Sequence, residues 1–117
     1  MRQFFVYIMA GQARRLYVGV TSDLRRRVWQ HREGAFSAFT SEYRVTRLVY
    51  FESAADIRSA VAREKELKAW PRARKIRLVE GDNPGWQDLS DGWFERQATR
   101  SVEAHTRRRP LGASESN

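Results

Sequence analysis

The feature that most constrains the fold is a pair of β-rich runs near the start of the sequence. Residues 3–9 (QFFVYIM) and 15–20 (RLYVGV) are separated by residues 10–14, which include one glycine. Two such runs joined by a few residues are typical of a β-hairpin. The sequence therefore predicts that its first two strands pair antiparallel.

Each run carries one tyrosine, Tyr7 in the first and Tyr17 in the second. Side chains alternate between the two faces of a strand, so an even pairing register puts both rings on one face, where they can lie opposite each other. Gly19 would then leave an open spot beside them for a backbone or a ligand. Two packed core tyrosines and a bulge glycine explain the same pattern, and the hairpin alone does not decide between these interpretations.

The next part of the chain alternates helix and strand signals. An N-cap cluster at residues 21–23 predicts a helix that runs to about Glu33 and is followed by Gly34. Residues 35–43 (AFSAFTSEY) fit a turn or a short helix, and residues 46–53 (TRLVYFES) predict the third strand.

Three helical segments complete the predicted fold. Residues 54–70 form the first, because the ring of Pro71 disfavours its continuation. Residues 72–80 form the second and stop at Gly81, and residues 86–94 form a short third one. Without this short last helix the order is β-β-α-β-α-α, which predicts the α+β class, with a small three-stranded antiparallel sheet flanked by helices.

The composition limits the architecture to one small domain. The chain has 117 residues, 41% of them hydrophobic, and no cysteine, which excludes disulfides and cysteine-based zinc sites. Apolar residues become scarce after about residue 97, where TRRRP appears, so we expect a domain at residues 1–95 and a basic, disordered tail at residues 96–117. The N-terminal apolar run is too short for a membrane span or a signal peptide, which predicts a cytoplasmic protein without membrane contacts.

The charge indicates the kind of partner. Lys and Arg number 22 against 14 Asp and Glu, a formal net charge of +8. Such an excess favours a polyanion such as nucleic acid, because each phosphate contact releases condensed counterions. A basic surface that serves solubility alone is the alternative.

The helix predicted after the hairpin has two kinds of polar residue. Leu24 and Val28 mark its buried stripe, while Arg27 and His31 are four residues apart and share a face that borders the sheet. Its remaining arginines, Arg25, Arg26 and Arg32, spread positive charge over the exposed surface. A solvated arginine face and a plain surface histidine are the default interpretation of this segment.

A carboxylate interrupts the apolar stripe of the helix predicted at residues 54–70. The stripe consists of Ile57, Ala60, Val61 and Leu67. Glu64 falls inside it, so its charge must recover lost solvation from a cation, a metal ion or hydrogen bonds. A salt bridge to an arginine is one solution. A site for Mg²⁺ or Mn²⁺ is the other, since carboxylate oxygen suits these hard ions.

Five segments taken in order resemble the GIY-YIG nuclease superfamily. They are VYI, YVG ten residues after it, TSDLRRRVWQH, AREKELK and NPGWQDL. The chain looks most like the compact single-domain bacterial branch, which is related to the nuclease module of the excision-repair incision subunit. The similarity covers about residues 3–89, and the ordered set is far more specific than any one segment.

The resemblance implies a role for each matching residue. Tyr7 would be the general base or water-orienting group, and Tyr17 would hold the attacking water or the scissile phosphate. Gly19 completes the second motif. Arg27 would neutralise charge on the phosphate, and His31 matches a histidine that some members carry one turn later.

Two further residues match the family pattern. Glu64 resembles the single metal-binding glutamate, which would hold one Mg²⁺ or Mn²⁺, and Asn83 resembles an asparagine found late in several members. Tyrosine is a poor base near neutral pH unless nearby positive charge favours its phenolate. The arginine-rich helix is the expected source of such a shift.

Three functions are therefore in competition. The first is a divalent-metal-dependent DNA endonuclease or nickase in DNA repair or processing, acting as a monomer on DNA, including branched or damaged DNA, without a small-molecule cofactor. The second is a catalytically silent module that binds nucleic acid through the same basic face, with Arg25, Arg26 and Arg32 on phosphates. The third is an interaction domain whose Trp86 and Trp93 dock a protein partner.

Overall fold

The computed structural model describes residues 3–34 and 42–94. The predicted tail at residues 96–117 and most of the segment at residues 35–43 lie outside the described residues. Within them the elements follow the predicted order as far as the second of the three helices expected after the third strand.

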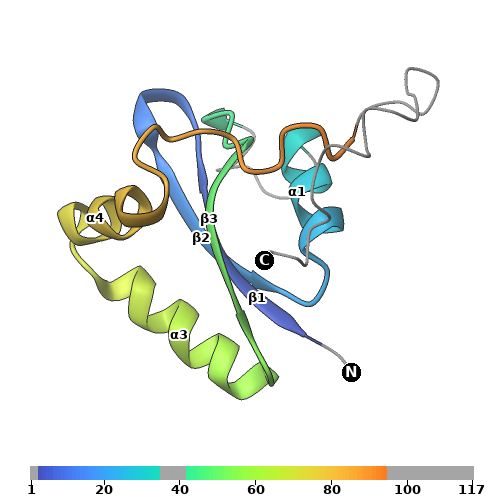
Figure 1. Cartoon of the computed structure of the whole chain (residues 1–117), viewed down its shortest axis with the longest axis vertical. Helices are drawn as coiled ribbons and strands as arrows, with labels where there is room; N and C mark the ends of the chain where they lie inside the picture. Colours follow the sequence, from blue (N-terminus) through green and yellow to red (C-terminus); the bar gives the residue numbers. More distant parts are fainter. Residues whose placement is uncertain (1–2, 35–41, 95–117) are drawn as a thin grey trace.

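A three-stranded antiparallel sheet forms the centre of the molecule (Figure 1). Its strands are β1 (Phe4–Ala10), β2 (Leu16–Thr21) and β3 (Arg47–Ala54), in the spatial order β2-β1-β3. A short 3-10 turn at Gln12–Arg14 closes the predicted hairpin. The fold is therefore α+β, as the sequence predicts.

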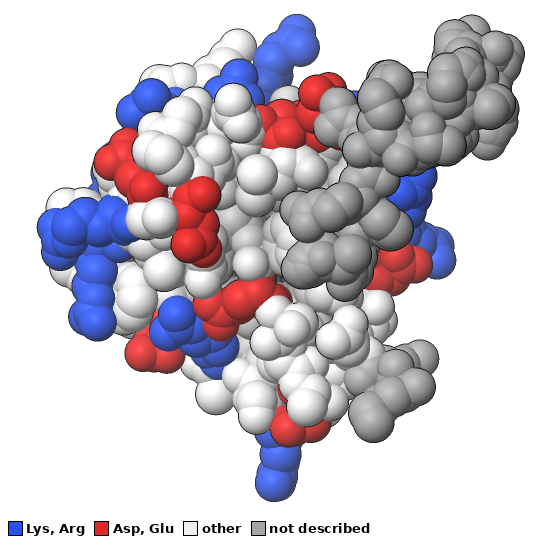
Figure 2. Space-filling view, in the orientation of Figure 1, with Lys and Arg blue, Asp and Glu red and all other residues white. Residues whose placement is uncertain are grey.

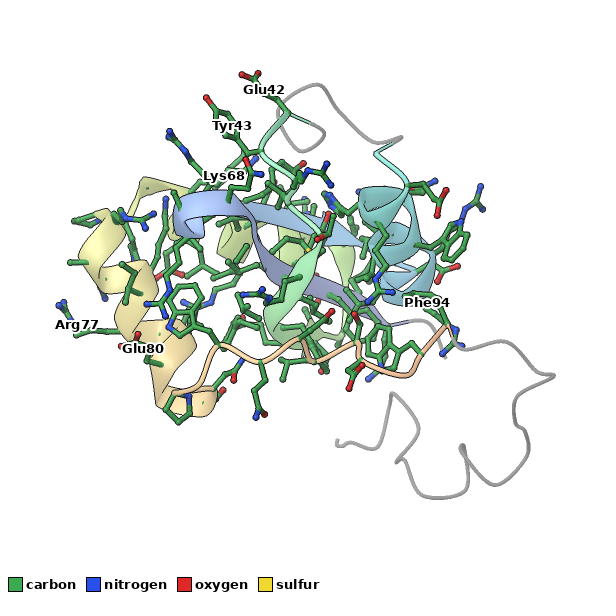
Figure 3. All side chains as sticks on the ribbon, turned by 90° about the horizontal axis from the view of Figure 1, so that it is seen from above. Glu42, Tyr43, Lys68, Arg77, Glu80 and Phe94 are labelled. Atoms are coloured by element: carbon green, nitrogen blue, oxygen red, sulfur yellow. The ribbon has the colours of Figure 1, made fainter. Side chains whose placement is uncertain are left out.

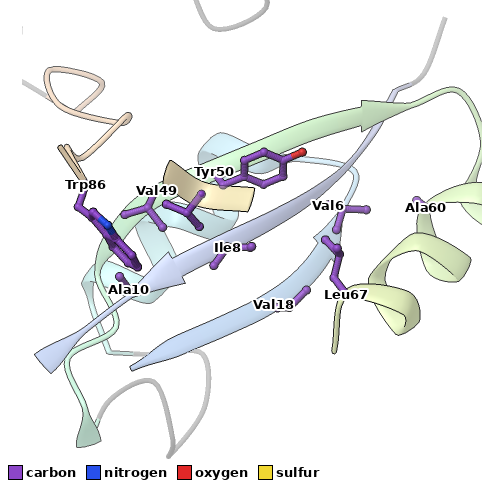
Figure 4. Packing of buried hydrophobic residues seen from close by; sticks show 10 residues of the cluster. Val6, Ile8, Ala10, Val18, Val49, Tyr50, Ala60, Leu67 and Trp86 are labelled. Carbon is purple, nitrogen blue, oxygen red and sulfur yellow. The ribbon is translucent and has the colours of Figure 1, made fainter. Parts of the chain in front are cut away.

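Helices cover both faces of this sheet. One face packs Tyr7 and Met9 against Leu24 and Val28 of α1 (Leu24–Arg32). The other face carries Val6, Ile8 and Val18 under α3 (Ile57–Ala69) and α4 (Arg72–Asp82), as Figure 4 shows for part of this core. Because β1 is the central strand, its residues from Val6 to Ala10 are buried on both faces. Burial of one such aliphatic side chain contributes about 1.5–3 kcal/mol.

Two helix boundaries differ by two or more residues from those predicted. Helix α3 begins at Ile57 rather than at residue 54, because the Asp56 carboxylate caps it by accepting a hydrogen bond from the Ser59 backbone N–H at 2.8 Å. Helix α4 does not stop at Gly81 but continues to Asp82, where Asn83 is its C-cap residue. The helix thus ends at residue 82, two residues after the end at residue 80 that Gly81 predicts.

The predicted last helix at residues 86–94 is absent from the described structure, where this segment forms turns. Its shape depends on Asp88, whose Oδ1 accepts hydrogen bonds from the Ser90 backbone N–H at 2.9 Å and the Ser90 hydroxyl at 2.6 Å. The Leu89 backbone N–H also donates to the Leu48 carbonyl of β3 at 2.7 Å. These local and long-range bonds replace helical ones.

No helix among the described residues is both long enough and apolar enough to cross a membrane. On the face drawn in Figure 2, acidic and basic side chains are interspersed, and this view shows no single basic patch.

Candidate active site

Strands β1 and β2 bring the two tyrosines to one face of the sheet. Tyr7 pairs with Gly19 and Met9 pairs with Tyr17, so the tyrosines are diagonal neighbours with ring centroids 6.3 Å apart. A Cβ atom on Gly19 would lie 2.5 Å from the Tyr7 hydroxyl oxygen. The space expected to be open at Gly19 is therefore filled by the Tyr7 ring itself.

Gly19→Ala is expected to displace Tyr7, because a contact of that length cannot be accommodated without movement. Overpacking of this kind typically lowers the free energy of unfolding by about 1–3 kcal/mol. Gly81→Ala is the matched control, since a Cβ there meets nothing within 4 Å. Urea unfolding of both variants tests the point, and equal stabilities would contradict the proposed packing of Tyr7 on Gly19.

His31 lies behind the two tyrosines and is fully buried. Its ring centroid is 5.7 Å from that of Tyr7 and 5.1 Å from that of Tyr17, both in edge-on arrangements. Its Nε2 atom is 3.1 Å from the Tyr7 hydroxyl oxygen. Burial, assisted by the charge of Arg27, lowers the pKa of His31 to about 4, so the imidazole is neutral at pH 7. The default interpretation of His31 as a surface residue is wrong.

Tyr7 connects His31 to Arg27. Burial raises the pKa of Tyr7 above its usual range, and a hydrogen bond from the Arg27 side chain opposes this only in part. Arg27 donates to the Tyr7 oxygen, and the Tyr7 hydroxyl can donate its own proton to Nε2 in the His31 tautomer that carries its proton on Nδ1. Arg27 does favour the Tyr7 phenolate, as predicted, but the expected net lowering of the Tyr7 pKa is wrong, because desolvation outweighs the charge of Arg27.

The low pKa of His31 predicts acid instability. In the unfolded chain His31 binds a proton near pH 6.5, whereas in the folded protein it does so only near pH 4. The free energy of unfolding is therefore highest above pH 6.5, and it falls as the pH is lowered toward 4. Between about pH 7.5 and about pH 4.5 this loss amounts to roughly 2.5 kcal/mol. Urea unfolding at both pH values, for wild type and His31→Gln, isolates this contribution. An identical pH dependence in the two proteins would contradict it.

Arg27 faces a small open cavity at the start of α1. The cavity has a volume of about 260 Å³ and is lined by Thr21, Ser22, Asp23, Arg26, Arg27 and Gln30. The Arg27 Nε atom donates to the Gln30 side-chain oxygen at 3.1 Å. A half-buried guanidinium fixed in this way is suited to bind an anion that enters from solvent.

Glu64 approaches the tyrosines from α3. Its side chain is only 15% exposed, and its charge acts on the hydroxyls of both Tyr7 and Tyr17. Its cation is Lys68, one turn further along the same helix, with the Nζ and Oε2 atoms 2.8 Å apart. The salt bridge to an arginine that the sequence suggests is thus replaced by one to Lys68, which lies four residues away on the same helical face.

The donor set at Glu64 is compatible with a divalent cation. Among residues 3–34 and 42–94, no group of three or more His, Cys, Asp or Glu side chains gathers around one point. A single carboxylate suits Mg²⁺, which keeps several of its waters and completes its coordination with substrate phosphate oxygens. Glu64 fits that pattern, because it is poorly solvated and faces the two tyrosines.

Comparison with known protein families shows which family this chain belongs to. The model of the GIY-YIG catalytic domain matches residues 3–77 of this chain, which include both strands of the hairpin, α1, β3 and α3. The chain belongs to the GIY-YIG family.

Proteins similar to this chain include several with the description UPF0213 protein. The one from Haloquadratum walsbyi is 36% identical over 76 residues, 65% of this chain and 85% of that protein. The one from Staphylococcus aureus is 35% identical over 80 residues, 68% of this chain and 98% of that protein. The solution NMR structure of a UPF0213 protein from Bacillus halodurans is 26% identical, with a TM-score of 0.50 over 76% of this chain and 95% of that one.

Asn83 does not join this GIY-YIG site. It is buried at the end of α4, where its side-chain NH₂ donates to the carbonyls of Val49 and Gln87 at 3.1 and 2.9 Å. Its Oδ1 atom accepts from the Gln87 backbone N–H at 3.0 Å. These bonds give Asn83 a structural task, because its amide fastens the segment after α4 to β3, and the structure does not bring it to the tyrosines.

The three arginines expected to bind nucleic acid separate into two groups. Arg25 donates to the Trp93 carbonyl, and Arg32 pairs with Asp88 at 3.1 Å. The guanidiniums of both lie over the ring of Phe94, beside α1 in Figure 3. Arg25 and Arg32 thus hold the last described segment, whereas Arg26 is exposed and lines the cavity with Arg27. Only Arg26 retains a geometry suited to the expected phosphate contact.

The structure also argues against a docking role for Trp86. Its side chain is 4% exposed, its indole N–H donates to Glu80 at 2.6 Å, and Arg14 lies 4.4 Å from its ring centroid. Trp86 is part of the core (Figure 4), so the tryptophan-based protein interface is wrong for this residue.

Two site residues were missed from the sequence. Gln30 lies three residues after Arg27 and accepts from it, and Lys68 lies four residues after Glu64 and pairs with it. Both follow from helical spacing, which places such residues side by side. That signal is present in the sequence itself.

Proposed function

We propose that this protein is a divalent-metal-dependent endonuclease that hydrolyses phosphodiester bonds in DNA. The observation that supports it is the convergence of unlike chemical groups around the two tyrosine hydroxyls: two phenols, a neutral imidazole, a guanidinium and a carboxylate. A core that needed only packing would place apolar side chains there instead.

In this proposal Arg27 and Glu64 provide charge. The guanidinium of Arg27 binds the scissile phosphate at the cavity and stabilises the negative charge that develops on its oxygens. Glu64 holds one Mg²⁺ or Mn²⁺, which supplies charge stabilisation at the phosphate when it is bound. Arg26, on the same cavity, binds a neighbouring phosphate.

In the same proposal the two tyrosines and His31 position the attacking water and accept its proton. Tyr17 is partly exposed and is the phenol that substrate can reach, so it holds the attacking water or the phosphate. Tyr7 is fully buried, with its hydroxyl oxygen 3.1 Å from Nε2 of His31. In this proposal the hydroxyl donates to Nε2 and accepts a proton from water only as its own proton passes to Nε2. Arg27 is one cause of the low pKa of His31, so a phosphate that neutralises Arg27 makes His31 a better proton acceptor.

One observation favours a second candidate function. The hydroxyl of Tyr7 has no exposed surface, and burial raises its pKa, so this phenol is not ionised in the site without substrate or metal. A module that binds nucleic acid through Arg26 and Arg27 without cleaving it would have the same features.

Supercoiled plasmid distinguishes the two functions. We expect the purified protein to convert it to nicked circles with millimolar Mg²⁺ or Mn²⁺, and to bind it without cleavage in chelator. Salt-sensitive binding without nicking under either condition would favour the silent module. Absence of both binding and nicking would contradict both proposals.

A further inference from the structure

Lys68 is the cation paired with Glu64 among the residues that the structure describes. The pair spans adjacent turns of α3 and is asymmetric, since the Glu64 side chain is 15% exposed and that of Lys68 is 52% exposed. The carboxylate is thus fixed against the protein while the ammonium group approaches it from solvent.

This ion pair and a metal ion compete for the same atom. Lys68 Nζ is 2.8 Å from Glu64 Oε2, which is a full charge-assisted hydrogen bond. A divalent ion at that oxygen cannot tolerate an ammonium group at the same distance, because the two cations repel. Binding of a metal ion therefore requires Lys68 to leave, and its long flexible stem allows this without movement of the helix.

The released ammonium group stays close to the tyrosines. The charge of Lys68 acts on the Tyr17 hydroxyl and favours its phenolate, against the opposing effect of burial. Tyr17 is itself partly exposed. An anion that lies against Tyr17 is therefore within reach of Lys68, and a phosphate of a nucleic acid backbone is the anion that the proposed function brings there.

We propose that Lys68 is an exchangeable counter-ion. It neutralises Glu64 in the metal-free protein and moves to a backbone phosphate of the substrate when a divalent ion takes its place. This inference rests on the proposed function. It adds a substrate-binding residue whose contribution depends on metal, and it explains how the protein keeps a poorly solvated carboxylate stable before metal arrives.

The first test is metal affinity without nucleic acid. Lys68→Met removes the ammonium group and keeps most of the stem, so Mn²⁺ should bind roughly two- to fivefold more tightly, the size expected for release of a partly exposed ion pair. Lys65→Met, at an exposed position on the same helix, is the control and should leave the affinity unchanged. Electron paramagnetic resonance of free Mn²⁺ measures both. Equal or weaker binding by Lys68→Met would overturn the exchange.

The second test is the salt dependence of binding to a DNA duplex, in a Tyr7→Phe background that suppresses cleavage. With Mn²⁺, Lys68→Met should reduce the slope of log affinity against log salt by about 0.9, the value for one lost phosphate contact. In chelator it should change nothing, because Lys68 is then held by Glu64. A reduction of equal size under both conditions, or under neither, would overturn the proposed move to phosphate.

Different results would contradict the metal-dependent nuclease function and the role of Lys68. If wild type binds no Mn²⁺ and cuts no plasmid, the metal site itself is wrong and the exchange falls with it. If wild type binds Mn²⁺ and cuts plasmid while Lys68→Met behaves like Lys65→Met in both tests, the proposed function stands and only the role of Lys68 is wrong.

Discussion

Glu64→Gln is expected to abolish metal-dependent cleavage and to leave the fold intact. Glutamine has the same shape but no charge, so it cannot replace a carboxylate as a ligand of a hard cation. Loss of the charge stabilisation that the ion supplies should reduce the cleavage rate at least ~10²–10³-fold. The cost in unfolding free energy should be small, about 0.3–0.5 kcal/mol, because the variant loses only an ion pair between adjacent turns with an exposed lysine.

Glu66→Gln is the matched control for this variant. Glu66 lies on the same helix and pairs with Arg63 at 3.0 Å, but its side chain is 51% exposed. It should lose a similar ion pair and keep full plasmid cleavage. If the two glutamine variants cleave equally well, Glu64 is a structural residue and the metal site lies elsewhere.

Tyr7→Phe is expected to reduce cleavage by ~10²–10³-fold, as is typical when a group acting on charge or protons in the transition state is lost. The ring still fills the space above Gly19, but the link between Arg27 and His31 is broken. Nε2 of buried His31 also loses the Tyr7 hydroxyl, so the free energy of unfolding should fall by about 1–2 kcal/mol.

Because this variant loses some stability, it needs a control that loses stability alone. Tyr50→Phe provides one, since the Tyr50 hydroxyl donates to Glu52 at 2.5 Å and its ring packs in the core on the opposite face of the sheet. Both variants should unfold at lower urea concentrations than wild type, and only Tyr7→Phe should lose cleavage. Full activity in Tyr7→Phe would make Tyr7 a packing residue and leave the proposed chemistry without its central hydroxyl.

Local patterns predicted most of the fold. Alternation of side chains within the hairpin placed Tyr7 and Tyr17 on one face, and the even register bears this out. Spacing by four residues placed Arg27 and His31 together on α1, and both act on Tyr7. These relations depend only on the geometry of one strand pair or one helix, which a sequence determines directly.

What could not be predicted depends on contacts between distant segments. Asn83 lies 34 residues from Val49 in the sequence, and its amide is used there rather than at the tyrosines. Arg25 is 68 residues from the Trp93 carbonyl that it binds. Burial also depends on distant segments. It raises the pKa of Tyr7, whereas the charge of the neighbouring arginines alone predicts a lower pKa.

The central claim is that Glu64 holds a divalent cation beside the two tyrosines, and melting temperature tests it most directly. Wild type and Glu64→Gln would be melted with chelator and with millimolar Mn²⁺. An ion that binds only the native state stabilises it, so Mn²⁺ should raise the melting temperature of wild type and leave that of Glu64→Gln unchanged. Equal shifts in the two proteins, or no shift in wild type, would contradict the assignment of Glu64 as the metal ligand.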